Sequence, residues 1–147
     1  MLAAIAAFVL LGLLNTFGQR PSTSDARTAA ATLVVTAPSD VRGGLIFQVR
    51  IQITARRRLA KPTLVFSPAW FESMTTNAVA PQPSTQTSIN GWPAFQLSPI
   101  PAGQHATYWF YFQVNPTNVG WRRPETLQLD DGHVVIASIH RTITVYP

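Results

Sequence analysis

The stretch LIFQVRIQIT, residues 45–54, determines the fold class of this chain. Large apolar side chains occupy every second position, and most positions between them are polar; the apolar set is Leu45, Phe47, Val49, Ile51 and Ile53. A period of two is typical of a strand with one buried face, because a helix would scatter the same residues around its axis. We therefore predict a long strand here, with this apolar set in the core.

A second strand of the same kind is predicted over ATYWFYFQV, residues 106–114. Its core face would hold Tyr108, Phe110 and Phe112, and we expect this face opposite the apolar set of residues 45–54. Trp109 and Tyr111 then stand on the outer face of the sheet. They either pack on a neighbouring loop or strand, or form a partner interface, since Trp and Tyr dominate binding hot spots.

Shorter apolar runs are separated by turn residues along the rest of the chain. Strands are predicted at 32–37, 61–66, 92–97, 125–129 and 134–145, and Asp130-Asp131-Gly132 signals a hairpin between the last two. Residues 75–90 are predicted to be an irregular loop or a weak edge strand, because Pro81 and Pro83 cannot sit in a central ladder. No periodic helix longer than one turn is indicated after residue 18, so a parallel sheet, which needs crossover helices, is not expected. The pattern indicates an all-β, antiparallel β-sandwich of about seven strands over residues 32–147.

The first residues, MLAAIAAFVLLGLLNTF, are apolar and carry no charged side chain before Arg20. At ~1.5 Å per residue this helix would span about 25 Å, slightly short of a ~30 Å hydrocarbon core. A cleaved signal would need a basic start and a small-residue exit, and the sequence offers neither in a good position. We predict an uncleaved transmembrane helix over residues 1–18 rather than a signal or a buried soluble helix, followed by a flexible linker over 19–31.

The orientation of such an anchor is ambiguous. Arg20 and Arg27 follow the helix, which by the positive-inside rule favours an intracellular domain, whereas the composition of the tail favours the outside. We predict a single-pass protein of the cell membrane with an extracytoplasmic domain. The two signals agree if the start codon lies upstream of Met1 and the additional residues supply basic side chains before the helix.

Composition narrows the functional classes. Apolar residues make up 46% of the chain and charged residues 12%, so a folded domain is expected rather than a disordered one. The chain has no cysteine, which excludes disulfides, thiol catalysis and thiolate metal sites. Its net charge of +5 makes an anionic partner possible.

Two turn-and-strand patterns carry a resemblance to a known family. Ala37-Pro38 and Gly43-Gly44 lead into residues 45–54, and the turn at 99–103 leads into 107–114. In these features the chain resembles bacterial cell-surface immunoglobulin-like domains of the CARDB type. With its segments FGQRPST and NPTNVG it also resembles small membrane-anchored proteins of actinobacteria. The resemblance covers most of the chain from residue 32 onward and implies an immunoglobulin-like sandwich, not a reaction.

Catalytic and metal-binding signatures are weak. No Gly-x-Ser-x-Gly nucleophile elbow occurs, and the three histidines fall near strand ends or on a strand. Asp130, Asp131 and His133 could offer ligands to one ion, but a calcium site needs six to eight oxygens. We therefore predict no enzyme, no cofactor and no metal.

The remaining candidates are surfaces that could bind a partner. Two basic clusters fall in predicted loops, and the second follows a tryptophan; either cluster is a solvated loop or a contact for an anionic partner. The candidate partner-binding residues are Trp109, Tyr111, Trp121, Arg122, Arg123, Arg56, Arg57 and Arg58. Nucleic acid is disfavoured by the predicted compartment.

The sequence thus predicts a membrane-anchored, extracytoplasmic binding or scaffold domain of the bacterial cell envelope, whose partner is an envelope protein or an anionic envelope polymer. Two alternatives stay open: a small envelope enzyme with a site on its loops, and a secreted binding module after signal cleavage.

Overall fold

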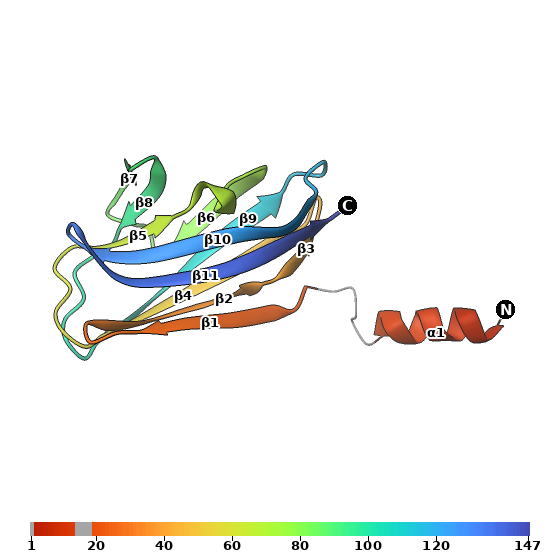
Figure 1. Cartoon of the computed structure of the whole chain (residues 1–147), viewed down its shortest axis with the longest axis horizontal. Helices are drawn as coiled ribbons and strands as arrows, with labels where there is room; N and C mark the ends of the chain where they lie inside the picture. Colours follow the sequence, from red (N-terminus) through yellow and green to blue (C-terminus); the bar gives the residue numbers. More distant parts are fainter. Residues whose placement is uncertain (1, 14–18) are drawn as a thin grey trace.

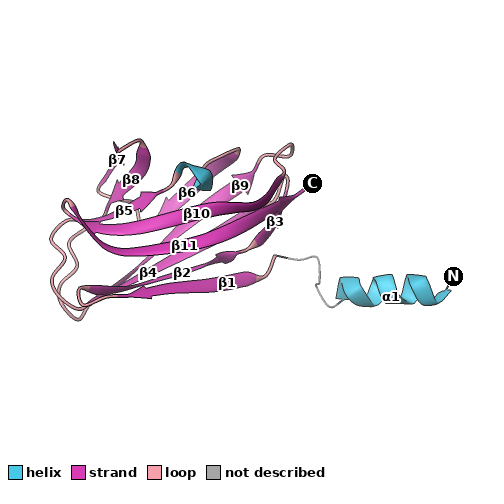
Figure 2. Cartoon of the chain, viewed as in Figure 1, coloured by secondary structure: helices cyan, strands magenta, loops and turns pink. Residues whose placement is uncertain are grey.

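The computed structural model describes residues 2–13 and 19–147 of the chain (Figure 1). Apart from one helix and one 3-10 turn, its regular elements are strands (Figure 2). The elements are α1 (Leu2–Leu13), β1 (Pro21–Arg27), β2 (Ala31–Pro38), β3 (Asp40–Arg42), β4 (Ile46–Ala55), β5 (Pro62–Phe66), η1 (Pro68–Trp70), β6 (Met74–Ala80), β7 (Thr85–Ile89), β8 (Trp92–Gln96), β9 (His105–Val114), β10 (Gly120–Asp131) and β11 (Val134–Tyr146).

The strands form two sheets that share one core. The five-stranded sheet has the order β1-β2-β4-β9-β6, and the six-stranded sheet has the order β3-β11-β10-β5-β8-β7. All neighbouring strands are antiparallel except β3 and β11, which run parallel. The predicted all-β, mostly antiparallel class is confirmed, with more strands than the sequence suggested.

The alternating residues of β4 line the core as predicted. Val49, Ile51 and Ile53 are fully buried, and the ring centroids of Phe66 on β5 and Phe110 on β9 lie 4.9 Å apart across the two sheets. Burial of these side chains stabilises the sandwich by about 1.5–3 kcal/mol each.

Two details of this core prediction are wrong. Leu45 is 47% exposed, because β4 begins only at Ile46 and Leu45 lies at the end of the sandwich. The residues of β4 and β9 also do not face each other across the core, because the two strands are neighbours in one sheet with Val49 paired to Phe110.

Residues 75–90 contain two edge strands, which agrees with the edge-strand alternative for this segment. β6 closes one side of the five-stranded sheet and β7 closes one side of the six-stranded sheet. Pro81 and Pro83 lie between them, where no ladder hydrogen bond is required.

The predicted flexible linker differs from the structure. Pro21–Arg27 forms β1, which pairs antiparallel with β2 from Pro21 opposite Pro38 to Arg27 opposite Thr32. Backbone pairing does not depend on apolar side chains, so a segment of small polar residues can still form an edge strand. Ser22, Ser24 and Ala26 form its half-buried side.

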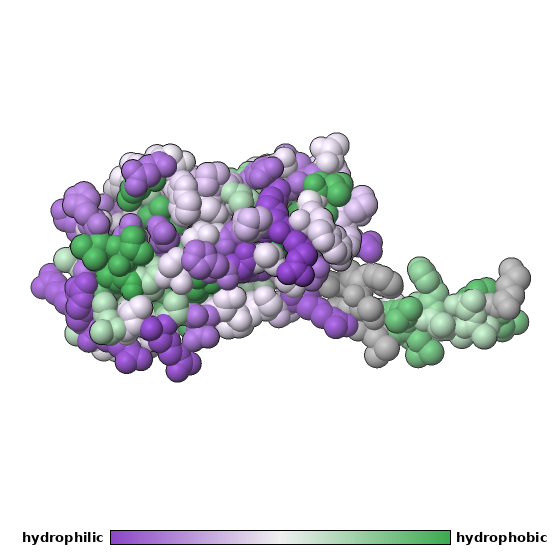
Figure 3. Space-filling model, in the orientation of Figure 1, coloured by the Kyte–Doolittle hydropathy of each residue, from purple (hydrophilic) through white to green (hydrophobic). Residues whose placement is uncertain are grey.

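The predicted membrane location requires correction. α1 has 12 residues and therefore rises about 18 Å, against a hydrocarbon core of ~30 Å. Within the described ranges, no helix combines the length and the apolar character needed to cross a bilayer. Met1 and residues 14–18 of the predicted anchor lie outside the described residues. Figure 3 shows α1 as a largely hydrophobic surface, and none of its residues is buried.

A buried ion pair interrupts the apolar core. Glu125 on β10 is 1% exposed, and its Oε2 lies 3.4 Å from Nε of Arg141 on β11. The Arg141 guanidinium also donates to the carbonyls of Ala37 and Pro38 and lies 5.5 Å from the ring centroid of Trp70. Burial raises the pKa of Glu125 to about 7, although Arg141 and Arg123 both act to lower this pKa.

We predict that Val49→Asp destabilises the domain by about 3–5 kcal/mol, because it leaves an unpaired charge in the core. That loss is a large part of the free energy of unfolding of a typical domain, which is ~5–15 kcal/mol. Arg50→Asp, one residue away on the outer face, is the control and should change stability by at most about 0.5 kcal/mol. Urea unfolding of the two variants measures the difference, and equal losses would mean that the buried face is assigned wrongly.

We also predict that stability falls as pH rises from about 4.5 to about 7. The folded state holds the Glu125 proton more tightly than the unfolded state does, so ionisation in this window opposes folding. A pKa raised from 4.5 to about 7 corresponds to a loss of the order of 3 kcal/mol. Melting temperatures measured from pH 4 to pH 8 should show this slope, and Glu125→Gln should flatten it; an unchanged slope in Glu125→Gln would assign the titration to another group.

Candidate functional site

The two predicted aromatic candidates lie together on one outer face. Trp109 and Tyr111 are half-buried on the outward side of β9 in the five-stranded sheet. The Gln48 side-chain amide donates to the Tyr111 hydroxyl over 2.9 Å, and Arg50 is the register partner of Trp109 on β4. The surface here is a sheet face, and part of each ring is covered by its neighbours.

The two basic clusters lie at opposite ends of the sandwich. Arg56, Arg57 and Arg58 follow β4, whereas Trp121, Arg122 and Arg123 lie at the start of β10 (Figure 1). The eight candidate residues therefore do not form one site.

The two clusters also differ in their contacts. Arg57 donates to the Asp131 carboxylate over 3.0 Å, so part of the first cluster's charge is balanced. In the second cluster Trp121 is 74% exposed, with its ring centroid 6.4 Å from that of Tyr146. The Arg123 side chain is only 12% exposed, and Nη1 lies 3.9 Å from Oε2 of Glu72.

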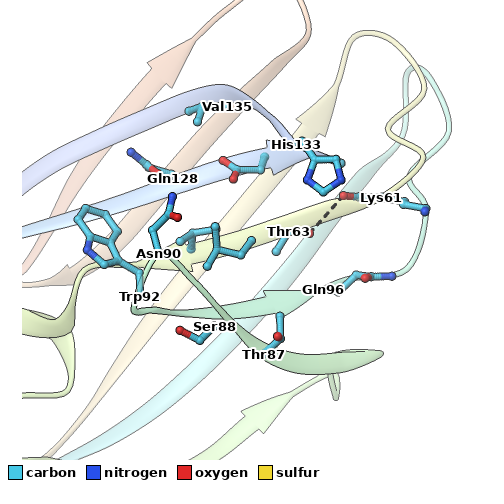
Figure 4. Close-up of a pocket in the computed structure, with 14 residues that line it drawn as sticks. Lys61, Thr63, Thr87, Ser88, Asn90, Trp92, Gln96, Gln128, His133 and Val135 are labelled. Atoms are coloured by element: carbon cyan, nitrogen blue, oxygen red, sulfur yellow. Dashed lines mark hydrogen bonds between the residues drawn. The ribbon is translucent and has the colours of Figure 1, made fainter.

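A groove that the sequence did not indicate lies among the described residues. It has a volume of about 800 Å³ and lies on the outer face of the six-stranded sheet, between the β10–β11 hairpin and the β7–β8 hairpin (Figure 4). Its lining residues are Lys61, Thr63, Val65, Thr87, Ser88, Ile89, Asn90, Trp92, Gln96, Gln128, Asp130, Gly132, His133 and Val135.

The floor of the groove comes from β5, whose residues are buried on both faces of the sheet. Leu64 and Phe66 point into the core, while Thr63 and Val65 point outward and are still only 6% and 2% exposed. Across this floor, Thr63 pairs with Asp130 of β10 on one side and with Gln96 of β8 on the other. The outward residues of β5 are covered because strands on both sides rise above them.

The wall formed by β7 and β8 depends on a tight turn. Asn90 and Gly91 connect the two strands with φ angles of 52° and 80°. Positive φ at both central residues is the requirement of the hairpin turn for which Asn-Gly is the preferred sequence. This dipeptide was the signal in the sequence that could have predicted the hairpin and therefore one wall of the groove.

Asp130 is the unusual residue of this groove. It is 6% exposed, and its Oδ1 is buried without a hydrogen-bond partner. Burial raises the pKa of its carboxyl group. The neighbouring Asp131, by contrast, accepts from Arg57 and from the backbone N–H of Lys61 over 2.9 Å. An unsatisfied buried acceptor costs stability, so its place in the fold needs a physical explanation.

The rim carries exposed and half-buried side chains with different chemistry at the two ends. Trp92 and Asn90 lie at one end, and His133 and Lys61 lie at the other (Figure 4). Gln128 lies near Asn90 and Trp92 and is the register partner of Val65, whereas Thr63 lies toward Lys61 and its hydroxyl donates to the Lys61 carbonyl over 3.3 Å. The site thus offers amide and hydroxyl groups, one indole, one carboxylate and one ammonium group.

Residue types that serve in catalysis and metal binding are spread over the described part of the chain. Its His, Cys, Asp and Glu side chains form no group of three that could hold a metal ion. His140 contacts Thr126 Oγ1 through Nδ1 at 3.0 Å and Ser138 Oγ through Nε2 at 3.5 Å. In the described residues no carboxylate orients this histidine, so the arrangement lacks the third member of a hydrolase triad.

Comparisons with known proteins give structural neighbours only. No family model and no curated protein matches the sequence. The crystal structure of a CARDB domain from Pyrococcus furiosus in complex with di-metal ions is similar with a TM-score of 0.49 and 9% identity, covering 86% of this chain and 89% of that chain. A solution structure of the CARDB domain has a TM-score of 0.49 and 10% identity, covering 80% and 97%. A chitin-binding domain of a P. furiosus chitinase has a TM-score of 0.43 and 16% identity, covering 80% and 100%.

We predict that Asp130→Asn stabilises the domain, because it removes a buried charge that has no partner. The pKa of Asp130 is raised in the folded state, so ionisation opposes folding and the gain should be larger at pH 8 than at pH 4. Asp131→Asn is the matched control and should destabilise the domain at pH 8, since it weakens the contact to Arg57. Urea unfolding at both pH values separates the two, and a loss of stability in Asp130→Asn would mean that this carboxylate has a partner within the fold.

Proposed function

We propose that this chain is a non-catalytic binding domain, and that the groove on the outer face of the six-stranded sheet is its ligand site. The observation that carries the proposal is the Asp130 carboxyl group, which lines the groove and whose buried Oδ1 has no hydrogen-bond partner among the described residues. A ligand that donates a hydrogen bond to this carboxyl group would offset the cost of burying its charge.

The dimensions and chemistry of the groove support this proposal. Its volume of about 800 Å³ falls within the range of small-molecule sites, which is ~300–1,000 Å³. Such sites combine an apolar surface with a few convergent polar groups, and here Trp92 and Val65 accompany Gln96, Gln128 and Asp130.

The outer face of the five-stranded sheet is a second candidate surface, favoured by the adjacent rings of Trp109 and Tyr111. This face is suited to a protein or polymer partner, because side chains along neighbouring strands present one continuous surface. The partial burial of both rings reduces the area that they offer to a partner.

We predict that ligands of this chain perturb the groove and not the opposite sheet. In ¹H–¹⁵N spectra of the full chain, titration with a panel of sugars, peptides and polyanions should shift the indole N–H of Trp92 and the amides of residues 128–133. Trp109→Ser combined with Tyr111→Ser should fold normally and leave these shifts unchanged. Shifts confined to residues 107–113 that the double change abolishes would transfer the proposed function to the second surface.

A further inference from the structure

We infer that the ligand of the groove is a neutral oligosaccharide, with one sugar ring stacked on Trp92 and a sugar hydroxyl donating to Asp130. This inference rests on the proposed binding function of the groove and specifies the class of molecule that it takes.

The lining of the groove matches hydroxyl groups. The Asn90, Gln96 and Gln128 amides each offer both donors and an acceptor, and the Thr87 and Ser88 hydroxyls also do both. A sugar hydroxyl likewise donates and accepts, so one sugar ring can engage several of these groups at once. Thr87, Ser88 and Asn90 are exposed and therefore free to reorient toward a ligand.

The position of Asp130 disfavours an anionic ligand. An ionised carboxylate only accepts hydrogen bonds, so Asp130 favours a ligand that donates and would repel a phosphate or carboxylate in the same groove. A metal ion is also disfavoured, because among the lining residues only Asp130 offers a carboxylate and only His133 an imidazole.

The charge of the groove favours a neutral ligand over a cationic one. Lys61 lines the same groove as Asp130, so the site holds an ammonium group as well as a carboxyl group, with His133 beside Lys61 at one end (Figure 4). A lysine-rich peptide would gain the contact to Asp130 and meet the Lys61 charge at the same time.

Trp92 supplies the apolar part of the contact. Its indole is half-buried at the end of the groove away from Lys61, on the strand that also carries Gln96. The face of an aromatic ring is electronegative, so it attracts the C–H groups on the flat face of a sugar ring, whose hydroxyls point outward to the amides.

The length of the groove indicates more than one sugar unit. Trp92 and Gln96 are the two ends of β8, and at ~3.3 Å per residue they lie about 13 Å apart along the strand. A single ring stacked on Trp92 therefore leaves Asp130 and Gln96 for the following units of a chain.

The experiment uses the full chain and neutral hexasaccharides of β-1,4-glucose, β-1,4-N-acetylglucosamine, α-1,4-glucose and β-1,4-xylose as probes in titration calorimetry. We expect at least one to bind, with an affinity reduced tenfold or more by Trp92→Ala and by Gln128→Ala. Asn90→Gly removes an amide while it keeps the positive φ of the turn, and it should also weaken binding. Trp121→Ala, at the other end of the sandwich, is the matched control and should bind as the parent chain does.

Circular dichroism of each variant shows whether it folds. If Trp92→Ala does not fold, Gln128→Ala and Asn90→Gly still test the site. A hexalysine peptide is the competing probe. If it binds in the groove and no hexasaccharide does, the saccharide inference is overturned while the proposed binding function stands. If no sugar, peptide or polyanion of the wider panel perturbs the groove residues, both the saccharide inference and the proposed binding function are overturned. Sugar binding that survives Trp92→Ala and Gln128→Ala also overturns the inference.

Discussion

Burial of the inward faces of β4 and β9 against the six-stranded sheet is the interaction on which the rest of the structure depends. These faces carry Val49 and Ile51 on one strand and Phe110 and Phe112 on the other, and all four side chains are fully buried. Removing them from water requires a second sheet with apolar residues at matching positions, which β5 supplies through Leu64 and Phe66. β5 therefore lies centrally in its sheet, between β10 and β8.

The groove is a consequence of this central position. β5 is held between β10 and β8, and its outward residues Thr63 and Val65 are buried as well. The β7–β8 hairpin, which turns at Asn90 and Gly91, lines the other side of the same groove. The same arrangement removes Asp130 from water without giving its Oδ1 a partner. The rigid core below can tolerate that cost, as proteins do at binding sites where stability is exchanged for function.

The two buried carboxylates of β10 show how environment separates a structural role from a candidate functional one. Glu125 points into the core, lies against Arg141, and belongs to a cluster that connects β10, β11 and the end of β2. Asp130 points outward into a groove, and the carboxylate next to it already takes the contact with Arg57. Burial raises the pKa of both groups, so the pKa shift alone does not distinguish them; the cavity in front of Asp130 does.

The sequence by itself determined the strands and their buried faces, since the alternation in residues 45–54 and 106–114 is local and sets which side chains point the same way. It also contained the Asn90-Gly91 turn, although the polar composition of residues 75–90 concealed the strands around it. Only the tertiary structure decided that β4 pairs with β9, that polar residues 21–27 add an edge strand, and that Arg57 meets Asp131. It also decided that Asp130 lines a groove. These features depend on which distant strands become neighbours and how their sheet curves, and a local pattern of side chains carries no information about either.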